Sequence, residues 1–198
     1  FKTREGGVMR LENLIADIDE EMFTKIVENR SVRDKDARDT AKIVGLAAIK
    51  YGDLSNQATK DYIFDVDRFT SFEGNTGPYI LYTIVRIKSI LNRYVEAGGN
   101  LEAGEILPAS NGSEKNLMLQ LSGFGSMIES AFEEKAPHKI CAYIYEVSNA
   151  FNSFYHETKI LSEENQAQKE SYIRLLQLTK RVLETSIDLL GFEAPDKM

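Results

Sequence analysis

The chain has 198 residues, 42% of them hydrophobic, so it is long enough to enclose a core and too apolar to be disordered. Its formal net charge of −7 excludes indiscriminate binding to nucleic acid or to an anionic membrane, so any nucleic-acid site must be a local patch. A single cysteine, Cys141, excludes an internal disulfide and suits a reducing cytoplasm. No apolar run has the length of a membrane span.

The first third of the chain is predicted to form two amphipathic helices. Apolar residues at helical spacing predict a helix over 11–29, and a second one over 34–51 is ended by Gly52. Residues 62–69 alternate only in part, so we expect extended or short irregular structure there. Before the first helix, residues 1–7 form a polar loop that starts without an initiator Met, and we therefore expect the chain to be a fragment of a longer protein.

A turn followed by a helix over 73–94 is the most informative stretch. Thr76 can cap the helix, and Pro78 suits its first turn because the missing N–H would have no partner there. One face of this helix is predicted to join the core, since apolar residues recur along it at helical spacing. These residues are Ile80, Ile84, Ile87, Leu91 and Tyr94.

The other face of this helix aligns two aromatic rings with two cations. Tyr79, Tyr82, Arg86 and Arg93 occur at i, i+3, i+7 and i+14. Rings beside cations are what unpaired nucleotides need, because bases stack on the rings and phosphates attract the positive charge. The alternative is an ordinary amphipathic helix with Tyr at the edge of the core and Arg in water. From the helix alone both interpretations stay open.

The second half of the chain continues with helices only. Residues 100–113 are predicted to be a mobile linker, because they are rich in glycine and small polar residues. Helices are expected over 114–134, from Pro137 to beyond Phe154, and over 162–190 with Ser162 as N-cap and Gly191 as the stop. With almost no strand signal, the fold class is predicted to be all-α, a helical bundle.

The chain offers little for catalysis. His138 and His156, the only histidines, lie near predicted helix ends and are interpreted as structural. Cys141 is interpreted as a packed small hydrophobic residue. No carboxylate pair has apolar neighbours that would raise a pKa for acid–base work. We therefore predict no complete catalytic site and no metal site.

Five short blocks occur along the chain: Phe1 to Gly7, Lys50 to Ser55, Asp61 to Asp65, Glu73 to Tyr79, and Asp196 to Met198. In this order and spacing they resemble the C-terminal half of bacterial-type class I arginyl-tRNA synthetases. The resemblance covers essentially the whole chain and implies a helical anticodon-binding bundle over 73–198, preceded over 1–72 by the end of a catalytic region. It also favours nucleic-acid binding over the ordinary-helix alternative.

The same resemblance implies roles for individual residues. Lys2, Thr3 and Arg4 correspond to the mobile class I signature loop that closes over the ATP phosphates. For the anticodon, Tyr79 and Tyr82 are carried over from the family pattern, as are Tyr155 and the terminal Met198. Two further tRNA contacts, Arg86 and Arg93, are inferred from the helix face alone.

The implied parent enzyme joins arginine to its tRNA with ATP and Mg. Its partners are arginine tRNA, ATP and arginine, and we expect a cytoplasmic monomer without membrane contact. The fragment itself is expected to hold no cofactor and to be inactive, since the nucleotide-binding core would precede Phe1. Two alternatives stay open, a standalone nucleic-acid-binding module and a protein-interaction bundle.

Overall fold

The computed structural model describes residues 10–28 and 34–198, and within these ranges it consists of helices and loops without a strand. The predicted all-α fold is confirmed. None of the described helices is both long and apolar enough to cross a membrane. The helices are α1 (Leu11–Glu28), α2 (Asp34–Leu54), α3 (Val66–Phe69), α4 (Gly77–Glu96), α5 (Gly112–Ser122), α6 (Phe124–Glu133), α7 (Pro137–Glu157) and α8 (Gln166–Leu189).

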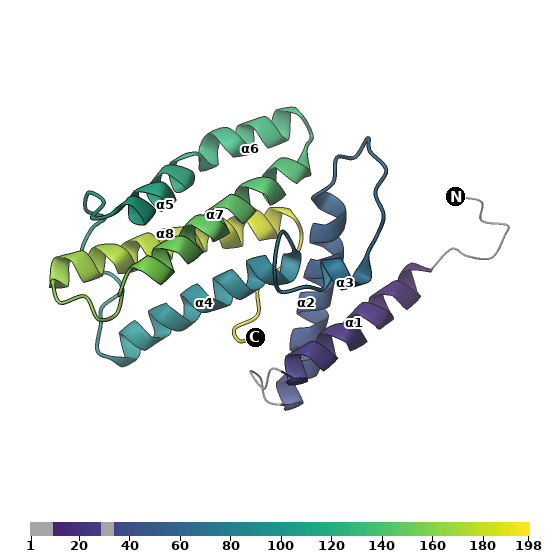
Figure 1. Ribbon diagram of the computed structural model, residues 1–198, viewed down its shortest axis with the longest axis horizontal. Helices are drawn as coiled ribbons and strands as arrows, with labels where there is room; N and C mark the ends of the chain where they lie inside the picture. Colours follow the sequence, from purple (N-terminus) through teal and green to yellow (C-terminus); the bar gives the residue numbers. More distant parts are fainter. Residues whose placement is uncertain (1–9, 29–33) are drawn as a thin grey trace.

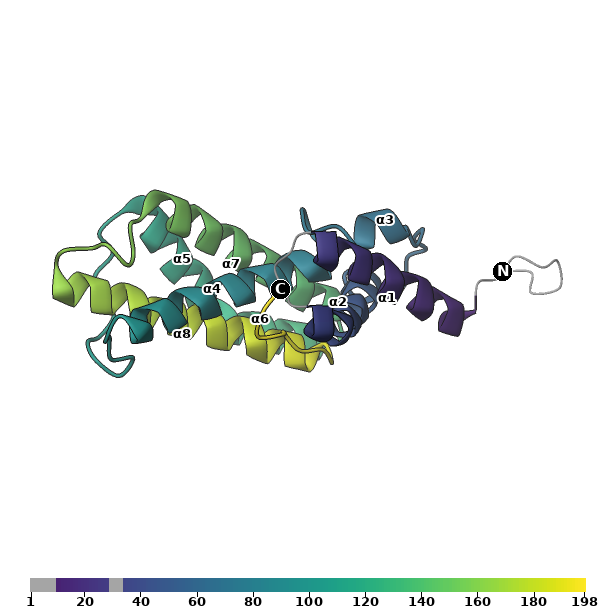
Figure 2. The same ribbon diagram turned by 90° about the horizontal axis from the view of Figure 1, so that it is seen from below.

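The molecule has a long bundle at one end and a helix pair at the other. Helices α4, α7 and α8 run alongside one another, with α5 and α6 over α7, whereas α2 stands across the beginning of α4 with α1 packed against it (Figures 1 and 2). The crossing of α2 and α4 is close, because a Cβ atom at Gly77 would collide with the backbone carbonyl of Ala47. Glycine at this position lets the two backbones touch.

The start of α4 is built as the sequence predicts. The Thr76 hydroxyl accepts a hydrogen bond from the Tyr79 N–H at 3.2 Å, and Pro78 lies in the first turn. Just before this cap, the Asn75 side chain accepts a hydrogen bond from the buried hydroxyl of Tyr51, which lies on α2. The same hydroxyl is 2.8 Å from the Cys141 carbonyl oxygen on α7, so it joins three parts of the chain.

The predicted apolar stripes meet in one core. On α4 the stripe is buried throughout, with Ile80, Ile84 and Ile87 fully inaccessible. The stripes of α7 and α8 close around it, which fixes the rotation of each helix and therefore which side chains remain outside. Buried residues that confirm these two stripes are Ile140, Ile144, Val147, Phe151, Phe154, Tyr172, Leu176, Leu183, Ile187 and Leu190.

Two predicted boundaries in the first third of the chain need correction. Helix α2 continues through Gly52 to Leu54 instead of ending at Tyr51. Glycine is needed at position 52 for packing, because a Cβ atom there would lie only 2.8 Å from the nearest ring carbon of Phe69. The segment that carries Phe69 was predicted as extended or irregular over 62–69; it is irregular up to Asp65 and then forms the short helix α3.

The single helix predicted over 114–134 is also wrong. It is interrupted at Gly123, whose N–H bonds to the Gln120 carbonyl three residues back, so α5 and α6 are separate helices. The nearby Gly125 further lowers the helix propensity of this stretch.

At the beginning of α8 the predicted cap, Ser162, is wrong. Asn165 caps the helix instead, with its side chain accepting from the Gln168 N–H. At the other end the predicted stop is confirmed, because Gly191 has a φ of +80°.

The segment 100–113 is attached to α8 and is not the mobile linker that its composition predicted. Leu107 donates its N–H to the Ser171 hydroxyl at 2.9 Å. The Ser110 hydroxyl lies 2.9 Å from that of Tyr172. Arg174 donates to the carbonyl of Leu101. The segment therefore forms a fixed layer on the outside of the bundle, held by α8 side chains whose partners could not be inferred from local sequence.

Candidate nucleic-acid interface

Three of the residues predicted on the α4 face converge with Tyr155 of α7. The centre is Arg86, whose guanidinium carbon lies 4.7 Å from the ring centroid of Tyr82 and 5.3 Å from that of Tyr155. A guanidinium over an aromatic face is attracted by the negative charge of the ring surface. The cation thus lies between one ring of α4 and one ring of α7.

Arg86 is fixed by a second contact from α7. Its Nη1 donates to the Asn152 side-chain oxygen at 2.7 Å. The Asn152 amide in turn donates to the hydroxyl of Tyr79 at 2.9 Å, so one asparagine orients both a cation and a tyrosine of α4. A side chain held this way loses less conformational entropy when a ligand binds.

Tyr79 is more enclosed than Tyr82 on the same face. Its hydroxyl donates to the Asn149 side chain at 2.8 Å, and its ring meets that of Tyr145 edge-on with centroids 5.7 Å apart. Burial raises the pKa of Tyr79, although the Asn152 amide favours the charged form. The hydroxyl therefore stays protonated at neutral pH, and its ring is half-buried against α7.

Tyr82 and Tyr155 supply the open aromatic surface. They are 41% and 36% exposed, respectively. Tyr155 is supported from below by the buried ring of Phe151, with centroids 6.1 Å apart and planes 23° from parallel. Two partly exposed rings with a cation between them form a surface on which unpaired bases can stack while a phosphate meets the guanidinium.

Arg93 lies on the same side of α4 but apart from this cluster. It follows Arg86 by seven residues, about 10.5 Å along the axis at 1.5 Å per residue. There it lines a small pocket of about 220 Å³ together with Tyr94, Leu161 and Lys169. The surface that the structure shows is thus an aromatic cluster with a separate cation two turns away.

Met198 is not brought into the cluster. Its side chain is half-buried and packs against the core from the C-terminal tail. The tail is held by Lys88 of α4, which lies about 200° around the helix from Arg86. The remaining predicted residues, Lys2, Thr3 and Arg4, lie outside the described part of the chain.

Sequence reasoning missed the asparagines that organise the cluster. Asn149 and Asn152 lie on α7 three residues apart and next to its buried stripe, so helical spacing offered a signal that they share a side. The local sequence does not indicate which other helix these two side chains contact. Their role follows only from the packing of α7 against α4.

The interpretation of Cys141 as a packed residue is confirmed. Its side chain is fully buried, and burial raises the pKa of the thiol to about 12. At neutral pH the reactive thiolate is therefore negligible. A search of the described residues for three or more grouped His, Cys, Asp or Glu side chains able to hold a metal finds none.

Comparison with protein families gives two matches along the chain. The family described as "DALR anticodon binding domain" matches residues 80–198, which include the whole aromatic cluster except Tyr79. The family described as "tRNA synthetases class I (R), catalytic domain" matches residues 1–66. The order of these matches agrees with the resemblance inferred from the short sequence blocks.

Curated relatives and solved structures agree with this assignment. The chain is 66% identical to the arginine–tRNA ligase of Agathobacter rectalis and 54% identical to that of Alkaliphilus oremlandii. All of this chain is covered in both, but it spans only 34% of each relative. The structure of Thermus thermophilus arginyl-tRNA synthetase superposes with a TM-score of 0.87 at 26% identity, over 98% of this chain and 33% of that one. The Plasmodium falciparum arginyl-tRNA synthetase gives 0.83 at 27% identity, over 96% and 34%.

Proposed function

This chain belongs to the DALR anticodon binding domain family, and we propose that it is the tRNA-binding part of an arginine–tRNA ligase. The observation that carries the proposal is Arg86, held between the partly exposed rings of Tyr82 and Tyr155. An anticodon loop presents unstacked bases and closely spaced phosphates, which match rings and a cation in contact. The acidic remainder of the chain limits binding to this local surface.

Individual roles follow from the geometry of the cluster. Tyr82 and Tyr155 accept bases, and Arg86 contacts a phosphate or a base edge beside them. The half-buried Tyr79 contributes the inner wall and, through Asn152, the orientation of Arg86. Arg93 contacts the RNA backbone farther along the loop or stem, and Met198 contacts the loop from the C-terminal tail.

For the complete enzyme we propose activation of arginine by ATP, with Mg, and transfer to the tRNA. Lys2, Thr3 and Arg4 then stabilise the negative charge that develops as pyrophosphate leaves. The chain divides into the end of the catalytic region, 1–72, and the anticodon-binding bundle, 73–198, a division supported by family matches over 1–66 and 80–198. The enzyme acts as a cytoplasmic monomer.

The decisive test is a titration of this chain with two transcripts of arginine tRNA, one unaltered and one with a mutated anticodon. We expect the unaltered transcript to bind more tightly, and both affinities to fall as salt increases. Equal affinity for the two transcripts contradicts anticodon recognition. Affinity that does not change with salt contradicts RNA binding and favours a protein-interaction bundle.

A matched pair of tyrosine variants tests the cluster itself. Tyr82→Ala is expected to weaken binding by about 1–3 kcal/mol, roughly 5- to 150-fold, because one stacked base is lost. Tyr62→Ala serves as the control, since Tyr62 has nearly the same exposure, 38% against 41%, but lies outside the bundle. Equal losses from both substitutions contradict the proposed surface.

We also expect the isolated chain to form no arginyl-tRNA when it is supplied with arginine, ATP and tRNA. Only its first 66 residues match the catalytic-domain family. Arginylation above background contradicts this expectation.

A further inference from the structure

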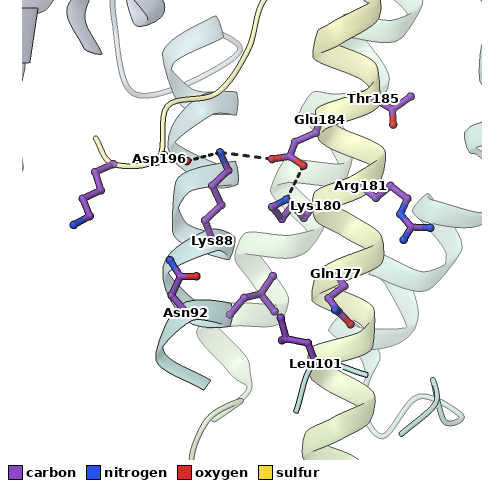
Figure 3. A pocket seen from close by; sticks show the side chains of 11 residues that line it. Lys88, Asn92, Leu101, Gln177, Lys180, Arg181, Glu184, Thr185 and Asp196 are labelled. Atoms are coloured by element: carbon purple, nitrogen blue, oxygen red, sulfur yellow. Dashed lines mark hydrogen bonds and ion pairs between the residues drawn. The ribbon is translucent and has the colours of Figure 1, made fainter. Parts of the chain in front are cut away.

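The side chain of Lys88 on α4 is only 16% exposed. Its ammonium group donates to the backbone carbonyls of Ala194 and Pro195, each at 3.2 Å. Two carboxylates complete its surroundings at 3.6 Å, Asp196 from the tail and Glu184 from α8. Figure 3 shows this side chain between α4, α8 and the C-terminal tail. One ammonium therefore joins three parts of the chain.

The tail that Lys88 holds is packed against the bundle at several points. It leaves α8 through Gly191, whose carbonyl accepts a hydrogen bond from Lys50 of α2. Phe192 and Pro195 are buried, and Met198 is half-buried against the core. Terminal residues are usually poorly ordered unless specific contacts hold them. Here the contacts come from lysines of two different helices.

The Lys88 contacts are the ones that fix the end of the tail. The carbonyls of Ala194 and Pro195 belong to a segment without regular structure, so neither has a helical or sheet partner. Asp196 is 99% exposed, and an ion pair to so open a carboxylate contributes little. The two carbonyls accept from a charged and mostly enclosed donor, which makes the stronger bonds. Lys88 therefore holds the tail mainly through the backbone carbonyls of Ala194 and Pro195, and only weakly through the charge of Asp196.

Glu184 keeps the ammonium in place from the other side. It pairs with Lys88 and also with Lys180, which lies 2.7 Å away. These side chains line one end of a groove of about 870 Å³ between α4, α8 and the tail. Lys180 pairs with the same Glu184 but makes no hydrogen bond or ion pair with the described tail residues, so it provides a matched control.

We propose that Lys88 is a positioning residue for tRNA binding, because it fastens the C-terminal tail and thereby holds Met198 where the anticodon loop can reach it. The inference rests on the proposed function in one respect, the contact between Met198 and RNA. The fastening itself is a property of the chain without RNA. The two parts can therefore be tested separately.

The fastening is tested by digestion with carboxypeptidase in the absence of RNA. Lys88→Met keeps the length of the side chain and removes the charge. Release of Met198 and Lys197 is expected to become roughly tenfold faster than in the unaltered chain, because cleavage follows the population of the opened tail. Lys180→Met should release them at the unaltered rate. An unaltered rate in Lys88→Met overturns the proposal.

Folding must be separated from fastening. Circular dichroism is recorded for both variants, and the helical signal should match that of the unaltered chain. If Lys88→Met loses helical signal, Lys88→Gln is used in its place, because its side chain is uncharged and one atom shorter, and faster release is again expected from the weakened bonds to the Ala194 and Pro195 carbonyls. No acceleration in that variant then overturns the proposal.

The positioning role is tested by tRNA affinity in a double-mutant cycle with a chain that ends at Pro195. Lys88→Met should weaken binding about as much as removal of residues 196–198, and the two changes together should cost no more than either alone. Additive losses, or unaltered affinity in Lys88→Met, overturn the role. If the unaltered chain binds no tRNA, the proposed function fails, while the digestion result still decides the fastening.

Discussion

The two outer sides of α4 both carry cations, and they use them in opposite ways. On one side Arg86 donates a single hydrogen bond to the Asn152 side-chain oxygen and otherwise faces two partly exposed rings. On the other side Lys88 is surrounded by carbonyls and carboxylates of its own chain. The guanidinium therefore has N–H donors left for a ligand, whereas the ammonium donates to groups of its own chain.

The difference shows that the charge of a residue does not by itself indicate a binding site. Arg86 is planar and stacks on rings while its remaining N–H groups stay available. Lys88 concentrates its charge on one nitrogen, which suits a point where several backbone oxygens converge. Between the two sides lies the buried isoleucine stripe, and the helical repeat of about 100° per residue determines how far they are rotated from each other.

Disrupting the buried isoleucine stripe of α4 should have the largest effect on stability. Ile84→Ala deletes a fully buried side chain, and we expect the free energy of unfolding to fall by about 2–5 kcal/mol. Urea denaturation followed by circular dichroism measures the change. The exposed Ser89→Ala on the same helix is the control, expected within about 0.5 kcal/mol of the unaltered chain. A loss below about 1 kcal/mol for Ile84→Ala would mean that the core around α4 repacks easily.

Disrupting only the side of α4 that carries Arg86 and Tyr79 should reduce stability less. Asn152→Ala removes partners of both Arg86 and Tyr79, and we expect a loss of stability of about 1–3 kcal/mol together with weaker tRNA binding. Fastening of the tail should not change. Asn92→Ala, an exposed asparagine that lines the groove on the Lys88 side, is the control. If tail digestion accelerates in Asn152→Ala, the two sides of α4 are coupled.

A charge change at Arg93 should be smaller and purely electrostatic. For Arg93→Ala, we expect the slope of log affinity against log salt to become shallower by about one. Stability should stay the same, because Arg93 is exposed at the end of α4. Affinity measured at several salt concentrations gives the slope. An unaltered slope would exclude a phosphate contact at this position.

The smallest perturbation is a thiol reagent directed at the buried Cys141 of α7, whose carbonyl oxygen lies 2.8 Å from the Tyr51 hydroxyl of α2. Because burial raises the pKa of this thiol to about 12, the reactive thiolate is scarce at pH 8 and becomes abundant only near that value. We expect no labelling of the native chain at pH 8 and one equivalent after unfolding, since the chain has one cysteine. Rapid native labelling would show that the core opens around Cys141.

Periodicity and capping chemistry predicted most helices because both are local. The Thr76 cap and the stop at Gly191 depend only on neighbouring residues, and both are present. The errors occurred where a distant residue changed the outcome. Gly52 continues α2 because the ring of Phe69 fills the space beside it, and segment 100–113 is held by side chains of α8.

For the candidate site, the sequence by itself determined that Tyr79, Tyr82 and Arg86 share one side of a helix, because the helical repeat aligns them. The tertiary structure decided that Tyr155 completes the cluster, that Asn152 orients Arg86, and that Tyr79 is half-buried. It also separated Lys88 from the other cations of α4 by placing the tail against it. The physical reason is that spacing along a helix fixes directions within that helix, whereas the partner of each side depends on how distant helices pack.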